Sequence, residues 1–275
     1  THTNWVMPRP IDDAAIVVAG GIEPLINLVS NGIDGAKQAA AKALSNLACN
    51  ADIRAEIASR GGIAPLINLV SNGTDGGKKH AAVALLRLTH LSPANQDAIR
   101  LENGIPPLVE LALNGADGTK DKATRALANL AWTNSANQDA IALNGGIPPL
   151  VELARHGTGG AKKEAAEALA RLAYLNACTQ GLIASEGGIV PIIDLVRTGA
   201  DTTQTKAAGA LANLAMGNFD NQTAIASADG IAPLIELVRG GTDGAREQAA
   251  KALAMLAVDN RDNQATIASS EGILL

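Results

Sequence analysis

Histidine and cysteine, the side chains that most often carry catalysis or bind metals, are few and scattered in this chain. Cys49 and Cys178 are far apart in the sequence, and two cysteines make no disulfide framework. The Gly73–Lys79 stretch lacks the spacing of a phosphate-binding loop. We therefore expect no enzyme, no metal site and no cofactor. The histidines, which show no metal-ligand spacing, are His2, His80, His90 and His156.

Asparagine and arginine, in contrast, alternate at nearly constant steps along the chain. An Asn amide offers both a donor and an acceptor, so it can pair with the unsatisfied backbone groups of an extended peptide. An Arg guanidinium can hold a carboxylate or a phosphate through two hydrogen bonds. The alternative is that the amides only tie loop backbone between neighbouring units. The recurring residues are Asn46, Arg87, Asn129, Arg171 and Asn213, with Met255 at the next step.

The same period governs the whole sequence. A Gly-Ile pair recurs every 41 or 42 residues, with its glycines at 21, 62, 104, 146, 188, 230 and 272. A period of about 40–47 residues is typical of stacked helical repeats, in which each unit buries apolar surface only against its neighbours. We therefore predict an all-α fold, a right-handed alpha-alpha superhelix (solenoid) of about six three-helix repeats.

The predicted organisation is a leader over residues 1–10 followed by a single repeat domain over residues 11–275. The repeats are expected at 11–50, 51–92, 93–134, 135–176, 177–218 and 219–260, with a partial repeat at 261–275.

Local signals divide each repeat into three helices. The first is short, as at 95–103, and stops at a Gly-Gly or Asn-Gly pair where positive φ is favourable. The second opens with proline, which suits a first helical turn, and ends at a glycine interpreted as C′. An aspartate two residues later is expected to cap the third helix, which is long and rich in alanine, as at 119–132. The prolines are at 24, 65, 107, 149, 191 and 233, the glycines at 32, 73, 115, 157, 199 and 241, and the aspartates at 34, 75, 117, 201 and 243. Periodic carboxylates of the second helices are expected on a solvated face; these are Glu110, Glu152, Asp194 and Glu236.

Composition limits the classes of partner. Only 1% of the residues are aromatic, so the core must come from Ala, Leu, Ile and Val. The net charge of −5 argues against a broad nucleic-acid or membrane surface, and no apolar stretch approaches the length of a membrane span. The N-terminus has no signal-peptide core, so a cytoplasmic or nuclear location is expected.

Several motifs carry a family resemblance over nearly the whole chain. They are GGI-x-PLINLV at 20–29 and 61–70, NGTDG at 72–76, ALSNLA at 43–48, and ALANLA at 126–131 and 210–215. With them the sequence resembles the armadillo-repeat family, which includes β-catenin and importin-α. The resemblance implies a concave groove, lined by third helices, that binds extended peptides. It also implies that Asn46, Asn129 and Asn213 hydrogen-bond the main chain of the peptide.

In each repeat, the position one helical turn before the recurring Asn, Arg or Met residue departs from the importin-α pattern. It holds no tryptophan, and its residues are Lys42, Val83, Arg125, Glu167, Gly209 and Lys251. Without these tryptophans, we expect this chain to lack the aromatic slots that bind lysine side chains in importin-α. The two positions together hold five cations (Lys42, Arg87, Arg125, Arg171 and Lys251) and one acid. Such a basic strip would orient an acidic partner; alternatively, the cations only solvate the helices.

Two aromatic side chains occupy one column of neighbouring repeats. Trp132 lies three residues after Asn129 and shares its helix face, and Tyr174 is the equivalent residue in the next repeat. They can form a shelf for an apolar side chain of the partner, or they can simply pack between repeats.

These observations predict a non-catalytic interaction module that binds an extended, acidic segment of another protein. The alternative is a structural scaffold or an engineered repeat framework without a peptide ligand. The sequence ends at Gly272–Leu275, part-way into an expected second helix and without a polar cap. We therefore expect a piece of a longer protein or an assembly of consensus repeats, and the exposed end would favour end-to-end self-association.

Overall fold

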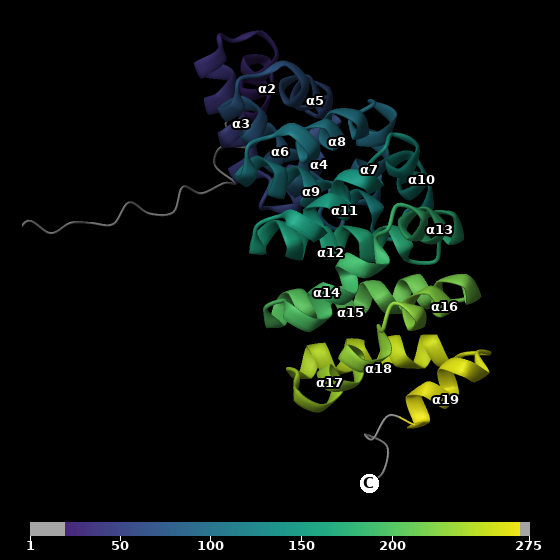
Figure 1. Ribbon diagram of the computed structural model, residues 1–275. Coiled ribbons are helices and arrows are strands. Elements are labelled where there is room, and N and C mark those ends of the chain that lie inside the picture. Colours follow the sequence, from purple (N-terminus) through teal and green to yellow (C-terminus); the bar gives the residue numbers. More distant parts are fainter. Residues whose placement is uncertain (1–19, 270–275) are drawn as a thin grey trace, which may run out of the picture. The chain divides into compact units, whose positions relative to one another are not determined.

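The computed structural model describes residues 20–269, and every regular element in that range is an α-helix (Figure 1). The described residues fall into two compact units, one ending at Glu102 and the other beginning at Asn103. The predicted leader and the end of the partial repeat lie outside the described residues. The helices of the first unit are α2 (Ile22–Asn31), α3 (Asp34–Leu47), α4 (Ala51–Ser59), α5 (Ile63–Asn72), α6 (Asp75–Leu88) and α7 (Pro93–Leu101).

The second unit repeats the order of a second, a third and a first helix. Its second helices are α8 (Ile105–Asn114), α11 (Ile147–His156), α14 (Ile189–Thr198) and α17 (Ile231–Gly240). Its third helices are α9 (Asp117–Ala131), α12 (Gly159–Ala173), α15 (Asp201–Ala215) and α18 (Asp243–Ala257). Its first helices are α10 (Ser135–Leu143), α13 (Ala177–Ser185), α16 (Phe219–Ser227) and α19 (Arg261–Ser269). The fold is an all-α solenoid of three-helix repeats, as predicted.

The core consists of small and branched aliphatic side chains. One isoleucine of each first helix from α4 to α16 is fully buried, as Ile141 and Ile183 illustrate. Alanines of the third helices are equally buried, among them Ala126 and Ala168. Alanine at these positions lets neighbouring helices approach closely, which is how the chain builds a dry core with so few aromatic residues.

The second helices begin earlier than their prolines suggest. Each starts at the isoleucine two residues before the periodic proline, so that Ile22 rather than Pro24 opens α2. Proline is tolerated there because none of the N–H groups in the first turn has a helical partner. The predicted proline remains in the first turn, but it does not mark the first residue.

The glycines that end the second helices act through space rather than through an unusual backbone. Gly32 has φ −72° and ψ 168°, an extended conformation that any residue can adopt, so its interpretation as a left-handed C′ residue is wrong. A Cβ added to Gly32 would lie 2.6 Å from the carbonyl oxygen of Leu28, and one added to Gly241 would lie equally close to that of Leu237. Glycine is needed because any Cβ at this position would collide with the carbonyl oxygen four residues earlier.

The third helices are capped one residue earlier than expected. The periodic aspartates are the first helical residues, as Asp75 is in α6, and the cap precedes them. The Thr74 side chain accepts a hydrogen bond from the backbone N–H of Gly77, and Thr158 serves α12 in the same way. The aspartates still lie at the positive ends of the helices, where a carboxylate is favourable.

The first helices end as predicted, with one exception. Gly61, Gly145 and Gly187 have φ between 70° and 75°, and Asn103 has φ 55°. The exception is Asp229, which adopts φ 56° at the equivalent position. Aspartate tolerates this conformation better than most residues do.

Candidate functional site

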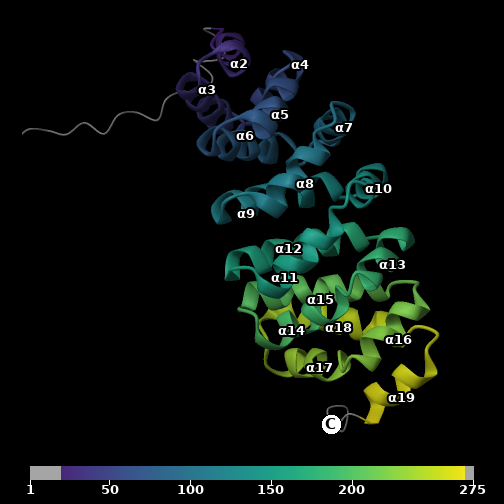
Figure 2. The same ribbon diagram turned by 45° about the horizontal axis from the view of Figure 1, so that its top comes forward.

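The third helices of the second unit lie side by side. Contacts join α9 to α12, α12 to α15 and α15 to α18, and this order is visible in Figures 1 and 2. One stripe of each helix stays accessible while the opposite face is buried, as Asn213 and Leu211 show in α15. The polar residues at the predicted positions therefore share one surface.

Buried amides of the first helices hold the ends of these third helices in place. The Gln180 Nε2 of α13 donates to the carbonyl of Ala173 at the end of α12 and to those of Asn213 and Met216 at the end of α15, at 3.1, 2.8 and 3.2 Å. Gln138 of α10 makes the equivalent bonds to the carbonyls of Ala131 in α9 and of Arg171 and Tyr174 at the end of α12. These glutamines fix the spacing between neighbouring third helices, and therefore the spacing of the polar row.

Asn129 and Arg171, two residues of the predicted row, contact each other directly. The Arg171 Nη1 donates to the Asn129 Oδ1 at 2.7 Å, across the gap between α9 and α12. The Arg171 guanidinium also lies 4.9 Å from the centroid of the Trp132 ring, a distance at which a cation interacts favourably with an aromatic face. Trp132 is 46% exposed, so it forms part of the accessible surface.

Glu167 links Arg171 to the next helix. The Arg171 Nη2 lies 2.6 Å from the Glu167 Oε1, and Lys206 of α15 pairs with the other carboxylate oxygen. Burial raises the pKa of Glu167, but the hydrogen bonds and positive charges of Lys206 and Arg171 outweigh burial and leave the pKa below its ordinary value. The carboxylate is therefore ionised at neutral pH and holds two cations at the surface.

Asn213 bridges α12 and α15 through the backbone. Its Nδ2 donates to the Ala170 carbonyl at 2.8 Å. This bond uses one of its N–H groups and orients the side chain, while an Asn amide has a second N–H and an oxygen acceptor to offer. Asn213 thus combines the expected inter-repeat bond with capacity for a ligand.

A hollow with a volume of about 440 Å³ opens along this row. It includes Trp132, Tyr174 and Asn213 together with two cations of the predicted basic strip, Arg171 and Lys251. The two predicted aromatic residues therefore line one surface. The other lining residues are Glu167, Ala170, Thr205, Lys206, Gly209 and Gln248.

The basic strip is more neutral than its sequence positions suggest. Arg125 of α9 pairs with Glu164 of α12 at 3.4 Å, and Lys163 lies 3.1 Å from the same carboxylate. Glu164 and Lys206 were not among the predicted residues, because each lies three residues before the position used to define the strip. A helix face also includes neighbours at i+3, which is the signal that would have identified them.

The first unit contains the same kind of pair on α3 and α6. Arg87 of α6 donates to the Ser45 carbonyl and, at 3.3 Å, to the Asn46 Oδ1. Lys42 is exposed on α3, near His80. Burial, followed by the positive charges of Lys42 and Lys79, lowers the pKa of His80. The alternation of Asn and Arg therefore forms side-chain pairs within each unit.

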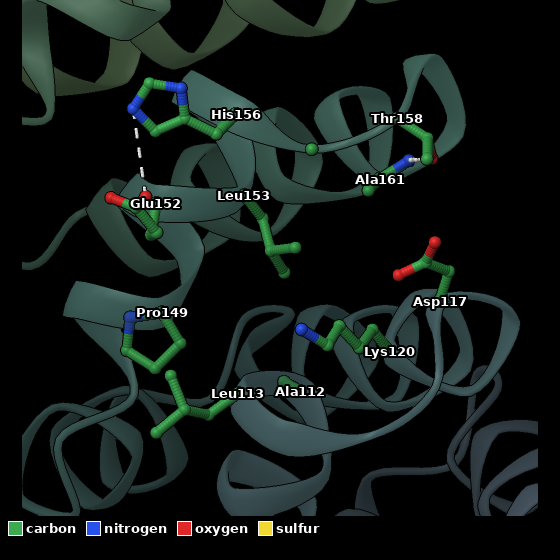
Figure 3. A pocket seen from close by; sticks show the side chains of 11 residues that line it. Ala112, Leu113, Asp117, Lys120, Pro149, Glu152, Leu153, His156, Thr158 and Ala161 are labelled. Atoms are coloured by element: carbon green, nitrogen blue, oxygen red, sulfur yellow. Dashed lines mark hydrogen bonds and ion pairs between the residues drawn. The ribbon is translucent and has the colours of Figure 1, made fainter.

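A second hollow, of about 300 Å³, lies apart from the predicted row and is lined by α8, α9, α11 and α12 (Figure 3). Figure 3 shows Lys120 and Asp117 reaching it from one side and Leu153 from the other. Glu152 and His156 at its edge are exposed and lie 3.8 Å apart. The periodic carboxylates of the second helices are all exposed, as predicted.

Residues 20–269 contain neither a metal-binding cluster nor a membrane-spanning helix. No group of three or more His, Cys, Asp or Glu side chains in this range is arranged to hold a metal ion. None of the helices in the same range is long and apolar enough to cross a membrane. Cys49 and Cys178 are both exposed thiols outside any disulfide.

Comparison with known proteins identifies the repeat. Residues 13–49 and 92–132 match the family model of the Armadillo/beta-catenin-like repeat. These two segments are similar to armadillo repeats. No curated protein matches it in sequence, but solved structures of engineered proteins do match it.

Three of these structures span the range of similarity. An engineered protein, target OR497, is 31% identical with a TM-score of 0.90; the match covers 94% of this chain and 64% of that one. Another, target OR329, is 28% identical with a TM-score of 0.84, over 86% of this chain and 97% of that one. A designed armadillo repeat protein in complex with the peptide (KR)4 is 21% identical with a TM-score of 0.80, over 86% and 99% of the two chains. At 21% identity this last likeness concerns the armadillo fold alone.

Proposed function

We propose that this chain is a non-catalytic interaction module whose third-helix groove binds an extended, acidic segment of another protein. The observation that carries the proposal is the charge of the 440 Å³ hollow in a protein of net charge −5. Three cations line it, Arg171, Lys206 and Lys251, against one carboxylate, that of Glu167. Local positive charge in an acidic protein attracts and orients an anionic partner.

The amides of the row would fix the path of the segment. An extended backbone exposes N–H and C=O groups that must be paired on binding, and Asn213 offers both kinds of partner beside the hollow. Consecutive third helices are packed at a spacing that suits about two extended residues per repeat, since packed helices lie about 8–10 Å apart and two residues span about 6.7 Å. The segment would thus cross α12, α15 and α18 in turn.

The designed armadillo protein solved with (KR)4 binds a basic peptide, so the sign of the preferred charge is the decisive measurement. We expect acidic peptides to bind this chain at least about tenfold tighter than basic peptides of the same length, a difference of about 1.4 kcal/mol. Calorimetric titration at two salt concentrations measures both the preference and its electrostatic origin, because salt weakens exposed charge interactions.

Two variants assign the binding to the groove. Arg171→Ala combined with Asn213→Ala should abolish the preference, because it removes a cation and an amide from the hollow. Arg239→Ala is the matched control, since Arg239 pairs with Glu236 on α17 and does not line the hollow. A preference for basic peptides would refute the proposal, and so would an affinity that the double variant leaves unchanged. Absence of binding by either class would favour the alternative of a scaffold without a peptide ligand.

A further inference from the structure

Gly209 stands out in the row of third helices. It lies in the interior of α15 at a position where the other repeats carry side chains. A glycine in a helix interior weakens the helix relative to alanine. Its backbone gives no reason for the glycine, since Gly209 is not among the residues with positive φ. The residues at the equivalent positions are Lys42, Val83, Arg125, Glu167 and Lys251.

The space around Gly209 gives no reason for the glycine either. A Cβ added there would approach only the Gln248 side chain, with its Oε1 at 3.2 Å, and that side chain is flexible. The effect of the glycine is therefore to leave room. Gly209 lines the hollow between α12 and α18, with Tyr174 on the α12 side and Lys251 on the α18 side.

The chemistry of this space is set by the charges around it. Lys206 and Arg171 are both paired with Glu167, whereas Lys251 is exposed and forms no ion pair among the described residues. Thr205 and Gln248 add a hydroxyl and an amide to the lining. An anion entering from the groove would meet hydrogen-bond donors on both sides and an excess of positive charge.

We infer that Gly209 opens a specificity pocket for one anionic side chain of the bound segment, with the stem of that side chain over Gly209 and its head beside Lys251. The head group is a carboxylate or a phosphate, which share this chemistry. This inference rests on the proposed function and adds to it the register of the segment: one acidic position is selected strongly and the others only by general attraction.

Filling the space tests the pocket. Gly209→Ala should stabilise α15 and Gly209→Leu should occupy the hollow. Gly181→Leu is the matched control, because Gly181 lies in the interior of α13 and nothing lies within 4 Å of its added Cβ. In an alanine scan of an acidic peptide, substitution at one peptide position should lower the affinity for the wild-type protein at least about tenfold. The same alanine substitution in the peptide should hardly change its affinity for Gly209→Leu, but should still weaken its binding to Gly181→Leu.

A small probe separates this inference from the proposed function. Capped glutamate and capped phosphoserine, titrated separately into ¹⁵N-labelled protein, should shift the amide resonance of Gly209, and Lys251→Met should abolish the shift. If the probes bind but acidic peptides do not, the Gly209 pocket is supported and the proposed binding of an extended segment is refuted. Acidic peptides that bind Gly209→Leu as they bind wild type, with the same scan, would overturn the pocket and leave the proposed function intact. Absence of a shift with both probes would also overturn it.

Discussion

The guanidinium of Arg171 donates to the side-chain oxygen of Asn129 at 2.7 Å, so the cation of one repeat is bonded to the amide of the repeat before it. The two functions expected of the row, selection of charge and pairing with the backbone, therefore compete for the same atoms. A carboxylate that captures Arg171 would also release the Asn129 oxygen from this donor. Charge recognition and main-chain recognition are coupled in this geometry.

Replacing Arg171 tests this coupling. In Arg171→Met the affinity for an acidic peptide should fall about tenfold, because a charge-assisted hydrogen bond is lost. The affinity for an uncharged peptide of the same length should rise, because the Asn129 oxygen no longer holds Arg171. Fluorescence anisotropy with both peptides measures the two changes. Arg239→Met should change neither affinity, and an equal loss for both peptides would contradict the coupling.

The sequence predicts the row but not its bonds. The period alone places Asn129 and Arg171 on neighbouring helices, because they are 42 residues apart, which is one repeat. Which side chains meet depends on the axial offset between those helices, and the period does not contain that offset. Helix spacing could place Glu164 and Lys206 on this face, but their pairing with Arg125 and Glu167 needs the offset.

The buried glutamines are a different case, because their signal is present in the sequence. An Asn-Gln pair recurs in the first helices, at 95–96, 137–138, 221–222 and 263–264. A polar pair that returns with the period at positions adjoining the buried isoleucine indicates a buried hydrogen-bond network. The recurrence of this pair, together with the expected burial of the first helices, is enough to predict the hydrogen-bond network.

Removing one of these glutamines should be costly. Gln180→Ala leaves the buried carbonyl of Ala173 and the partly buried carbonyls of Asn213 and Met216 without this donor, and we expect a loss of about 2–3 kcal/mol of unfolding free energy. Gln264 occupies the same position in α19, is exposed and, among the described residues, bonds only to the Ala257 carbonyl. Gln264→Ala should therefore cost about 1 kcal/mol or less. Urea unfolding of both variants measures the two losses of unfolding free energy. Equal losses would mean that the inter-repeat bonds of Gln180 contribute nothing to stability.

The glycines at the ends of the second helices should be irreplaceable for steric reasons. In Gly115→Ala the new Cβ would lie 2.5 Å from the Leu111 carbonyl oxygen, so we expect a loss of about 1–3 kcal/mol. Gly118, three residues later, has nothing within 4 Å of its added Cβ and lies in the first turn of α9. Gly118→Ala should be neutral or slightly stabilising. Thermal melts distinguish the two variants, and a harmless Gly115→Ala would show that the turn relaxes freely.

The Glu167 network should give stability a specific dependence on pH. Its pKa in the folded protein lies below the ordinary value of 4.5, so the unfolded chain takes up the proton first as the pH falls. The stabilisation is therefore fully present above about pH 4.5 and is lost as the pH falls through the folded pKa. Glu167→Gln removes this contribution, so its unfolding free energy should differ from wild type at pH 7 and approach it at pH 3.

Glu247→Gln is the control, because Glu247 is exposed on α18 and forms no ion pair among the described residues. Chemical unfolding from pH 3 to pH 7 measures the difference; a gap between Glu167→Gln and wild type that does not change with pH would mean that the pairs with Arg171 and Lys206 do not stabilise the fold.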